Sequence, residues 1–472
     1  MSHSGAMSND DNAVVADSDK HNEVIICAQF LRAKGCRMDK KREIVPCMRG
    51  LRGEIEIPGD KSISHRSIML SSLGSTPVHI TNFLRGQDCL STAACMRAMG
   101  VTVEDDGKDE ICVTGLGLHG LKEPAGILDA GNSGTTLRLL MGLLAPQPFL
   151  ATFTGDSSLC RRPMGRVIQP LSEMGAKIAG RAGNKLLPIT ILPAEKPLQG
   201  ISYEMPVASA QVKSAILLAG LYAEGETTVH EPFVSRDHTE RMLEAFGVPI
   251  LRQGSSVTIR PVQEYRAPQE IHVPGDISSA AYWLVLASIL PDSDVVLKNV
   301  GINPTRTGIL DVMERMGARF ECRNVRTSGG ERAADIRVVS AELHGTAFGA
   351  EMMPRLIDEI PVIAVAAAFA KGDTVITGAG ELRVKETDRL QAITDEYNRL
   401  MPGAFESGAD TLVIHGGKAI REGTCKSGDD HRMAMSLAVF GAAGKGVTIE
   451  RPDCVDISYP AFYTTLGYTG SR

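Results

Sequence analysis

The feature that most constrains the fold of this chain is an internal repeat of about 70 residues. Helix-like segments that close on a glycine recur along the chain, at Gly100, Gly175, Gly247, Gly317, Gly403 and Gly467. Short β-branched runs alternate with them, at residues 77–80, 149–153, 227–229, 295–297, 374–376 and 447–449. A glycine just after a helix takes the left-handed conformation that ends it, and β-branched runs favour strands. The repeat therefore predicts an α/β protein of six similar units.

A second recurrence suggests how the units divide into domains. Pro58-Gly59-Asp60 returns as Pro274-Gly275-Asp276, about three units later, and in each copy the Asp or a following Ser can cap a helix. We expect one domain inserted in another, with residues 61–274 as the second, inserted domain and residues 49–60 plus 275–472 as the first, discontinuous domain. Residues 1–48 are expected to form a flexible extension, in which Met38 is an alternative start. The cleft between two such domains is a common place for a small-molecule site.

Composition excludes several classes of protein. The formal net charge is −6 and aromatic residues make up 4% of the chain, which argues against a nucleic-acid-binding protein. No apolar run reaches the length of a membrane-spanning helix, and residues 24–31 follow acidic rather than basic residues, unlike a signal peptide. The ten cysteines form no C-x-x-C pair, so we expect free thiols in the cytoplasm and no metal site.

Several motifs place small polar residues with Lys or Arg at the start of an apolar, helix-like stretch. In the inserted domain they are residues 60–67, 131–138, 156–166, 208–214 and 235–241. Helix N-termini attract anions through free N–H groups and the helix dipole, and Arg makes bidentate contacts to carboxylates and phosphates. When each motif is taken alone, ordinary helix capping or a solvated basic loop explains it about as well as anion binding does.

The discontinuous domain carries charged motifs that include acidic residues. Asp358-Glu359 precedes the apolar stretch 360–370, residues 382–389 form the densest charge cluster, and residues 429–432 precede another apolar stretch. Asp358 could act as a general base or could simply face the helix dipole. The chain contains no Walker motif, no G-x-G-x-x-G after a strand and no G-x-S-x-G. Together the motifs predict a cleft ringed by helix N-termini that binds small polyanionic ligands.

In combination, the motifs resemble those of the 5-enolpyruvylshikimate-3-phosphate (EPSP) synthase family. The similarity rests on PGDKSISHR, GNSGT, RRPM, VKETDR and DHR in this order, and it spans about residues 49–470. SAQVKS and RDHTE are similar to the second class of these enzymes. The resemblance implies a two-domain, inside-out α/β barrel of six βαβαββ repeats, three per domain. It also implies a monomeric cytoplasmic enzyme without a cofactor, which transfers the enolpyruvyl group of phosphoenolpyruvate to shikimate 3-phosphate.

The resemblance also implies a role for individual residues. Asp358 would take the proton of the substrate 5-hydroxyl, Glu386 would deliver a proton to the enolpyruvyl methylene, and Lys61 would lie between the two substrates. The groups implied to hold shikimate 3-phosphate are Lys61, Ser62, Arg66, Ser209, Gln211, Arg236, Asp358 and Lys385. Those implied to hold phosphoenolpyruvate are Lys61, Asn132, Gly134, Arg162, Gln211, Arg389 and Arg432, with His431 in support. No metal is implied.

The chain departs from the family pattern at two positions. Ala210 stands where the first class has a second Ser, and Ile457 stands where the first class has a Lys that binds phosphoenolpyruvate. Gly134 keeps the small residue that is Ala in glyphosate-tolerant enzymes. We therefore expect inhibition by glyphosate, and an inhibition constant in the millimolar range would count against this.

Two alternatives stay open at this level. The first is the sister enzyme that transfers enolpyruvate to UDP-N-acetylglucosamine, which usually has Lys-Asn where this chain has Lys61-Ser62. That enzyme uses a loop cysteine, for which Cys160 would be the counterpart here. The second is a non-catalytic anion-binding protein on the same scaffold. Buried carboxylates would repel anionic ligands, so Asp358 and Glu386 beside arginines argue against pure binding.

Overall fold

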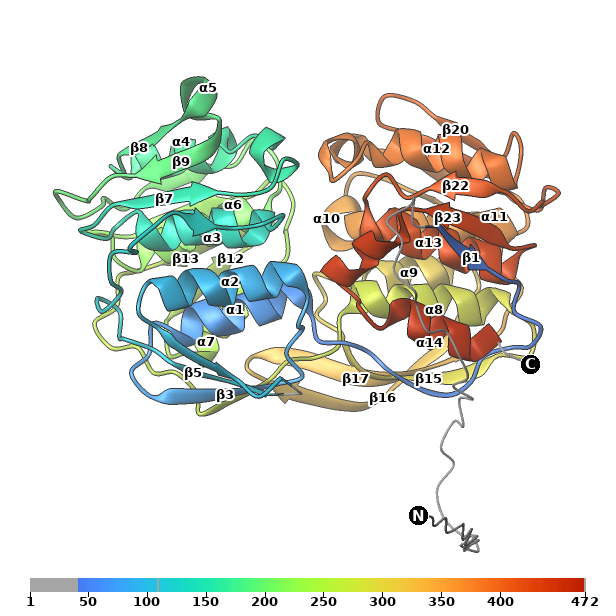
Figure 1. Ribbon diagram of the computed structural model, residues 1–472, viewed down its shortest axis with the longest axis horizontal. Coiled ribbons are helices and arrows are strands. Elements are labelled where there is room, and N and C mark those ends of the chain that lie inside the picture. The colour runs from blue at the N-terminus through green and yellow to red at the C-terminus, as the bar shows by residue number, and fades with distance from the viewer. Residues whose placement is uncertain (1–40, 108–109, 471–472) are drawn as a thin grey trace, which may run out of the picture.

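The computed structural model describes residues 41–107 and 110–470, which form two lobes side by side (Figure 1). The lobe drawn in blue to green contains helices α1 (Lys61–Ser71), α2 (Gln87–Ala98), α3 (Gly134–Leu144), α4 (Gly165–Glu173), α5 (Arg181–Asn184), α6 (Ala210–Gly220) and α7 (His238–Ala245), with the 3-10 turn η1 (Leu159–Arg161). Its strands are β3 (Pro77–Thr81), β4 (Thr102–Asp105), β5 (Glu110–Thr114), β6 (Leu128–Asp129), β7 (Ala151–Thr154), β8 (Ile178–Gly180), β9 (Leu186–Ile191), β10 (Ser202–Glu204), β11 (Thr227–His230), β12 (Ile250–Gln253), β13 (Ser256–Ile259) and β14 (Glu270–His272).

The other lobe holds both ends of the described chain. Its helices are α8 (Ile277–Ile289), α9 (Gly308–Arg315), α10 (Met353–Leu356), α11 (Ile360–Phe369), α12 (Arg389–Leu400), α13 (His431–Ala443) and α14 (Phe462–Gly470), with η2 (Ile357–Glu359), η3 (Gly380–Val384) and η4 (Pro452–Ile457). Its strands are β1 (Lys41–Ile44), β2 (Arg52–Glu56), β15 (Asp294–Gly301), β16 (Arg319–Ser328), β17 (Glu331–Val339), β18 (Ala347–Phe348), β19 (Asp373–Ile376), β20 (Phe405–Ser407), β21 (Leu412–His415), β22 (Thr424–Lys426) and β23 (Val447–Glu450). The fold is therefore a mixed α/β fold.

The sheets of the described chain share one strand pattern. Five have four strands, in the orders β14-β3-β5-β4, β6-β7-β9-β8, β10-β11-β13-β12, β2-β15-β17-β16 and β18-β19-β21-β20. In each of these, the second strand pairs in parallel with the first and antiparallel with the third. The sixth sheet, β1-β23-β22, has three strands, and β23 again has one parallel and one antiparallel neighbour.

The repeat predicted from the sequence agrees with these elements, with one exception. Each of the six β-branched runs overlaps a strand, namely β3, β7, β11, β15, β19 and β23. Five of the six glycines have positive φ, from 70° at Gly403 to 104° at Gly175. The sixth expectation is wrong, because Gly467 lies inside α14 and no strand follows it in the described chain. This glycine therefore does not close a helix before a strand of the described chain.

Three helices in each lobe are buried on nearly every side. In the first lobe these are α1, α3 and α6, and in the second they are α8, α11 and α13. Their sequences explain this placement, since an all-apolar stretch such as residues 360–370 has no polar face to expose to water. The buried apolar side chains form two separate cores, one from residues 63–273 and one from residues 44–57 and 277–466.

The two lobes are joined where the matching Pro-Gly-Asp turns meet. The amide of Asp60 donates to the Pro274 carbonyl at 2.7 Å, and the amide of Asp276 donates to the Pro58 carbonyl at 2.8 Å. The side chain of Asp60 caps α1 and that of Asp276 caps α8, as the motifs predicted. The paired turns thus fix the starts of two buried helices, one in each lobe.

Strand β1 corrects the expectation for the N-terminal segment. Residues 41–44 pair in antiparallel register with β23, so the last part of the expected flexible extension belongs to a sheet. The apolar Ile44 is buried there, a contact that no local sequence motif announces. Residues 1–40, which include Met38, lie outside the described residues. None of the described helices is long and apolar enough to cross a membrane.

Candidate active site

The site is built from the starts of the buried helices. Side chains cap α1, α3, α6, α8 and α13 at Asp60, Ser133, Ser209, Asp276 and Asp430. Each cap leaves other N–H groups of the first turn without a hydrogen-bond partner inside the helix, which favours binding of an anion. Ion pairs between the lobes bring the two sets of helix starts together: Arg236–Asp358 at 2.6 Å, Arg166–Glu381 at 3.2 Å and Arg162–Glu386 at 3.9 Å.

Asp358 lies at the centre of the positive charge. One carboxylate oxygen accepts from Arg236 Nη2 at 2.6 Å, and the other lies 3.2 Å from Arg389 Nη1 and 3.7 Å from Lys385 Nζ. Its side chain keeps 16% of its surface exposed, so a substrate can still reach it. The motif at residues 358–359 therefore supplies a carboxylate that is aimed at the site rather than folded onto a helix end.

Arg389 organises the carboxylates of the second lobe. Its side chain is 1% exposed and it contacts Asp358, Glu386 and Asp430, with distances to the latter two of 2.8 Å each. Glu386 and Arg389, three positions apart, form an ion pair, although only Arg389 lies within α12. Buried guanidinium groups suit such a role because they remain charged and donate in several directions.

The environment lowers the pKa of both acidic groups in this part of the site. Burial alone would raise the pKa of Asp358, but the charges of Lys385, Arg236, Arg432 and Arg389 outweigh burial and hold that pKa well below its usual value. Burial also opposes the ionised form of Glu386, yet Arg389, His431, Arg162 and Lys385 lower its pKa. Both carboxyl groups are therefore ionised in the ligand-free protein.

His431 and Arg432 begin α13 and differ in charge. Burial, together with the positive charges of Lys61 and Arg432, lowers the pKa of His431 well below its usual value, so its imidazole is neutral. Burial disfavours the charged form of Arg432, but Tyr282, Asp358 and other acidic groups raise its pKa. The start of α13 thus presents one fixed positive charge and one neutral ring.

The start of α1 contributes Lys61, Ser62 and Arg66. Lys61 Nζ pairs with Asp88 Oδ2 at 2.6 Å, and this carboxylate outweighs the effect of burial and raises the pKa of Lys61. Arg66 is buried, and its three nitrogens donate to Thr239 Oγ1, the Ser62 carbonyl and Ser214 Oγ. These bonds make Arg66 a brace between α1, α6 and α7, and direct contact of Arg66 with a ligand remains a prediction.

The turn before α3 lies beside Arg162. Arg162 Nη2 donates to Asn132 Oδ1 at 2.8 Å, and Arg162 Nη1 donates to the Asn132 carbonyl at 3.3 Å. A Cβ on Gly134 would lie 2.7 Å from Arg138 Nη1 and 3.6 Å from Arg162 Nη1. Gln211 at the start of α6 accepts from Arg138 at 2.6 Å. The structure thus places Asn132, Gly134, Arg162 and Gln211 in one group, and the small residue at 134 leaves room beside two guanidinium groups.

The sequence also matches a family of known proteins. The sequence profile described as EPSP synthase (3-phosphoshikimate 1-carboxyvinyltransferase) matches residues 47–466. The chain belongs to the EPSP synthase family. It is accordingly a transferase of the enolpyruvyl group and an enzyme of the shikimate pathway.

Relatives of the family match nearly the whole described chain. The 3-phosphoshikimate 1-carboxyvinyltransferase of Desulforudis audaxviator (strain MP104C) is 55% identical over 89% of this chain and 97% of the relative. That of Bacillus cereus (strain ATCC 10987 / NRS 248) is 50% identical over 90% of this chain and 99% of the relative. Among solved structures, the EPSP synthase from Acinetobacter baumannii is 43% identical, with a TM-score of 0.81 over 91% of this chain and 98% of that one. The enolpyruvyl transferase NikO from Streptomyces tendae shares the fold alone, at 18% identity and a TM-score of 0.74 over 92% of this chain and 98% of that one.

The structure adds residues that sequence reasoning did not assign to this EPSP synthase site. Asp88 holds Lys61, Arg138 holds Gln211, and Asp430 holds Arg389. The sequence alone shows that Arg138 is a basic residue one helical turn after Gly134, on the same face of the helix. Asp88 has no such signal, because it lies in a different helix and has no motif of its own.

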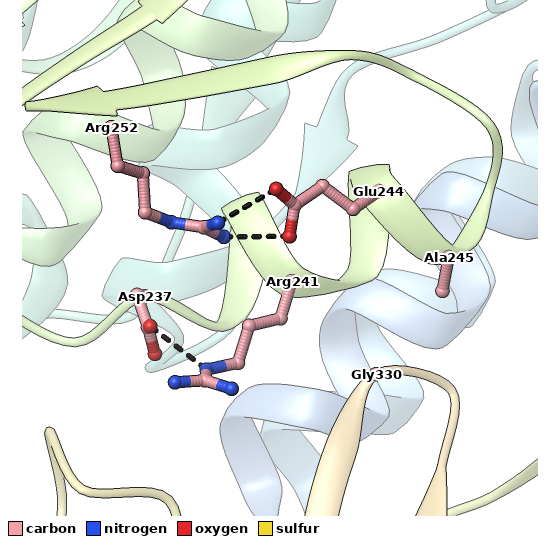
Figure 2. A pocket seen from close by; sticks show the side chains of 6 residues that line it. All are labelled: Asp237, Arg241, Glu244, Ala245, Arg252 and Gly330. Carbon is pink, nitrogen blue, oxygen red and sulfur yellow. Dashed lines mark hydrogen bonds and ion pairs between the residues drawn. The ribbon is translucent and has the colours of Figure 1, made fainter.

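A cavity of about 380 Å³ lies beside α7 and is lined by residues other than those predicted to hold the substrates (Figure 2). Its lining includes Gly330 and four charged side chains that pair with one another. Arg241 Nε lies 2.8 Å from Asp237 Oδ2, and Arg252 makes a two-point contact with Glu244. Because these carboxylates already balance the guanidinium groups, the cavity offers little excess charge to a polyanionic ligand. Within the described residues no cluster of His, Cys, Asp and Glu could hold a metal ion.

Proposed function

We propose that this chain transfers the enolpyruvyl group of phosphoenolpyruvate to the 5-hydroxyl of shikimate 3-phosphate, giving 5-enolpyruvylshikimate 3-phosphate and phosphate. The observation that carries the proposal is the partly exposed carboxylate of Asp358 among Arg236, Lys385 and Arg389, with Glu386 beside Arg389. A polyanion-binding site needs the cations, but only proton transfer needs the two carboxylates.

In the proposed addition step, Asp358 takes the proton of the substrate 5-hydroxyl as the oxygen bonds to C2 of phosphoenolpyruvate. Glu386 gives a proton to C3, so the methylene becomes a methyl group in a tetrahedral intermediate. In the second step the methyl group returns a proton to Glu386 as the C2–O bond to phosphate breaks, and Asp358 gives its proton to the departing phosphate. Phosphate leaves and the double bond returns, so atoms and charge balance over the two steps.

The low pKa of Glu386 requires the substrates to change its protonation. In the ligand-free protein, nearby cations keep Glu386 ionised, whereas a proton donor must carry a proton. The phosphates and the carboxylate of the two substrates bring negative charge next to these cations. Added negative charge raises the pKa of a neighbouring carboxyl group. Binding of both substrates therefore prepares Glu386 as an acid and makes Asp358 a stronger base.

The remaining groups divide between the two substrates. We assign shikimate 3-phosphate to Lys61, Ser62, Arg66, Ser209, Gln211, Arg236, Asp358 and Lys385. We assign phosphoenolpyruvate to Lys61, Asn132, Gly134, Arg162, Gln211, Arg389 and Arg432, with His431 in support. Arg138 adds a guanidinium beside Gly134, where it can supply the charge that Ile457 lacks. Convergent cations in a site that excludes water stabilise the charge that builds up on the departing phosphate.

We also propose the finer architecture and setting. The shared strand pattern of the six sheets supports six βαβαββ repeats arranged as an inside-out barrel, three per domain. The two separate cores support a division at residues 60–61 and 274–275. Cys89, Cys95 and Cys425 are free thiols, which suits a cytoplasmic protein. We expect a monomer that needs no cofactor.

Phosphate release from phosphoenolpyruvate tests the function directly. Release should require shikimate 3-phosphate, and nuclear magnetic resonance of the product should show the enolpyruvyl ether at the 5-oxygen. UDP-N-acetylglucosamine serves as the alternative acceptor. Release with that acceptor, or no release with either one, would contradict the proposal.

A further inference from the structure

A fully buried ion cluster lies behind Arg236, outside the groups assigned to the substrates. Lys213 Nζ pairs with Glu231 Oε2 at 2.7 Å and with Glu240 Oε1 at 2.8 Å. All three side chains are at most 1% exposed. Burying charges costs hydration free energy, so such a cluster is weak evidence for added stability and calls for another reason.

The cluster holds every polar backbone and side-chain group of Ser235, the residue before Arg236. The Ser235 amide donates to Glu231 Oε2 at 3.3 Å, and its hydroxyl donates to Glu231 Oε1 in a short hydrogen bond. Lys213 Nζ donates to the Ser235 carbonyl at 3.4 Å. One residue of a loop is thus fixed at three points by two buried charged side chains.

Apolar packing does not hold this loop in place. Phe233 and Val234 are 46% and 47% exposed, whereas Ser235 is 3% exposed. Half-exposed hydrophobic side chains restrain the backbone less than buried ones do. The buried polar contacts of Ser235 therefore restrain the loop between β11 and α7 directly before Arg236.

The residue after Arg236 is fixed from the other lobe. Asp237 accepts from Asn303 Nδ2 at 2.7 Å and from Thr305 Oγ1 at 3.1 Å, and Arg241 binds its second oxygen (Figure 2). Arg236 therefore lies between two anchored neighbours, and its guanidinium reaches Asp358 at 2.6 Å. Small errors in the placement of such a group are costly, because bidentate contacts to phosphate depend on geometry.

We propose that Lys213 and Glu231 position Arg236 through Ser235, and that this cluster sets the affinity for shikimate 3-phosphate. The inference rests on the proposed function, in which Arg236 holds that substrate. Lys213 and Glu231 touch no substrate, so they are positioning residues. A purely structural cluster would instead contribute to stability and leave affinity alone.

Ser235→Ala tests the link without leaving an unpaired buried charge. We expect the dissociation constant and the KM for shikimate 3-phosphate to rise about tenfold. A change of this size is typical for the loss of one hydrogen bond to a charged group. The KM for phosphoenolpyruvate and kcat should stay within about twofold. Ser235→Thr keeps the hydroxyl and should restore most of the affinity. The matched control is Ser293→Ala. It removes another buried hydroxyl, which accepts a hydrogen bond from the Leu51 amide in the other lobe. The affinity of this variant for shikimate 3-phosphate should equal that of the wild type.

Binding of shikimate 3-phosphate alone, measured by calorimetry, separates the possible failures. A Ser235→Ala protein with a lower Tm but unchanged affinity would overturn the positioning role while leaving the proposed function intact. A wild-type protein that does not bind shikimate 3-phosphate would overturn both. Lys213→Met should weaken binding of shikimate 3-phosphate at least as much as Ser235→Ala does. Circular dichroism checks that this variant folds. If it does not fold, the comparison of Ser235→Ala with Ser235→Thr still tests the positioning role.

Discussion

The two lobes contribute chemically different halves of one site. The first lobe brings cations and neutral polar groups, such as Lys61, Arg162 and Gln211, and its Asp88 carboxylate pairs with Lys61. The second lobe gathers the carboxylates Asp358, Glu386 and Asp430 around Arg389. Under the proposed assignment, most of the substrate-binding groups lie in the first lobe and both proton-transfer groups lie in the second.

The contrast teaches why the halves must meet before chemistry can occur. Arg236 of the first lobe reaches Asp358 of the second, and Arg162 approaches Glu386. The two proposed proton-transfer groups lie in the second lobe beside Arg389, whereas most of the groups assigned to the substrates lie in the first lobe. Substitutions in the second lobe should therefore reduce kcat, whereas substitutions in the first should chiefly raise KM.

The largest expected effect comes from Glu386→Gln, which removes the proposed proton donor. We expect kcat to fall by about 10²–10⁴-fold, the usual range for loss of a general acid. The control is Glu381→Gln, which breaks only the exposed pair with Arg166 and should change kcat by less than about twofold. Steady-state phosphate release measures both, and equal losses in the two variants would argue against a proton-transfer role for Glu386.

A smaller, different effect should follow from Arg236→Met in the first lobe. Loss of a charged hydrogen-bond donor should raise the KM for shikimate 3-phosphate by about 10–100-fold. The KM for phosphoenolpyruvate should change far less. Arg252→Met is a suitable control because it removes a guanidinium that contacts Glu244 beside the same helix. A variant that loses kcat without any change in this KM would break the proposed division between the lobes.

The pH dependence should link the halves through Asp358. Because nearby cations lower its pKa, the base stays ionised well into the acid range, and kcat/KM should lose activity only at low pH. Lys385→Met removes one of these cations, so the pKa of Asp358 should rise and the acidic limb should move to higher pH. Lys196→Met, a change at an exposed residue, should leave the limb in place. An acidic limb that moves to lower pH in Lys385→Met would contradict the assignment.

The smallest expected effect on catalysis comes from Gly134→Ala. The new methyl group would lie 2.7 Å from Arg138 Nη1, at the flexible end of that side chain, so a small shift can accommodate it. We expect the KM for phosphoenolpyruvate to rise about two- to fivefold, typical of mild overpacking. The inhibition constant of glyphosate should rise by a larger factor, from a value below the millimolar range. Competition assays against phosphoenolpyruvate measure both, and unchanged inhibition would place glyphosate elsewhere.

Sequence patterns predicted the regular parts of this molecule well. Short β-branched runs and helix-closing glycines depend on local backbone preferences, so six strands and five of six glycines followed the repeat. Helix caps such as Asp60 and Asp276 are also local, and both were confirmed. Gly467 was misread because the repeat was extended to the chain end, where no further strand follows in the described residues.

Contacts between segments that are distant in the chain could not be predicted from the sequence. Residues 41–44 join β23 across about four hundred positions of the chain, and nothing in their local pattern distinguishes an edge strand from an extension. Asp88 and Arg138 likewise act through partners in other helices. The cluster of Lys213, Glu231 and Glu240 reads as ordinary surface charge along the chain, and only the fold shows that it is buried.

The measurement that tests the account most directly compares chemistry and binding in one Asp358→Asn protein. Single-turnover phosphate release should fall by at least about 10²-fold. Calorimetry on the same sample should give a dissociation constant for shikimate 3-phosphate within about threefold of the wild type, because most of the groups assigned to this substrate lie in the first lobe. Near-normal phosphate release in this variant, or loss of binding together with release, would contradict the separation of recognition from proton transfer.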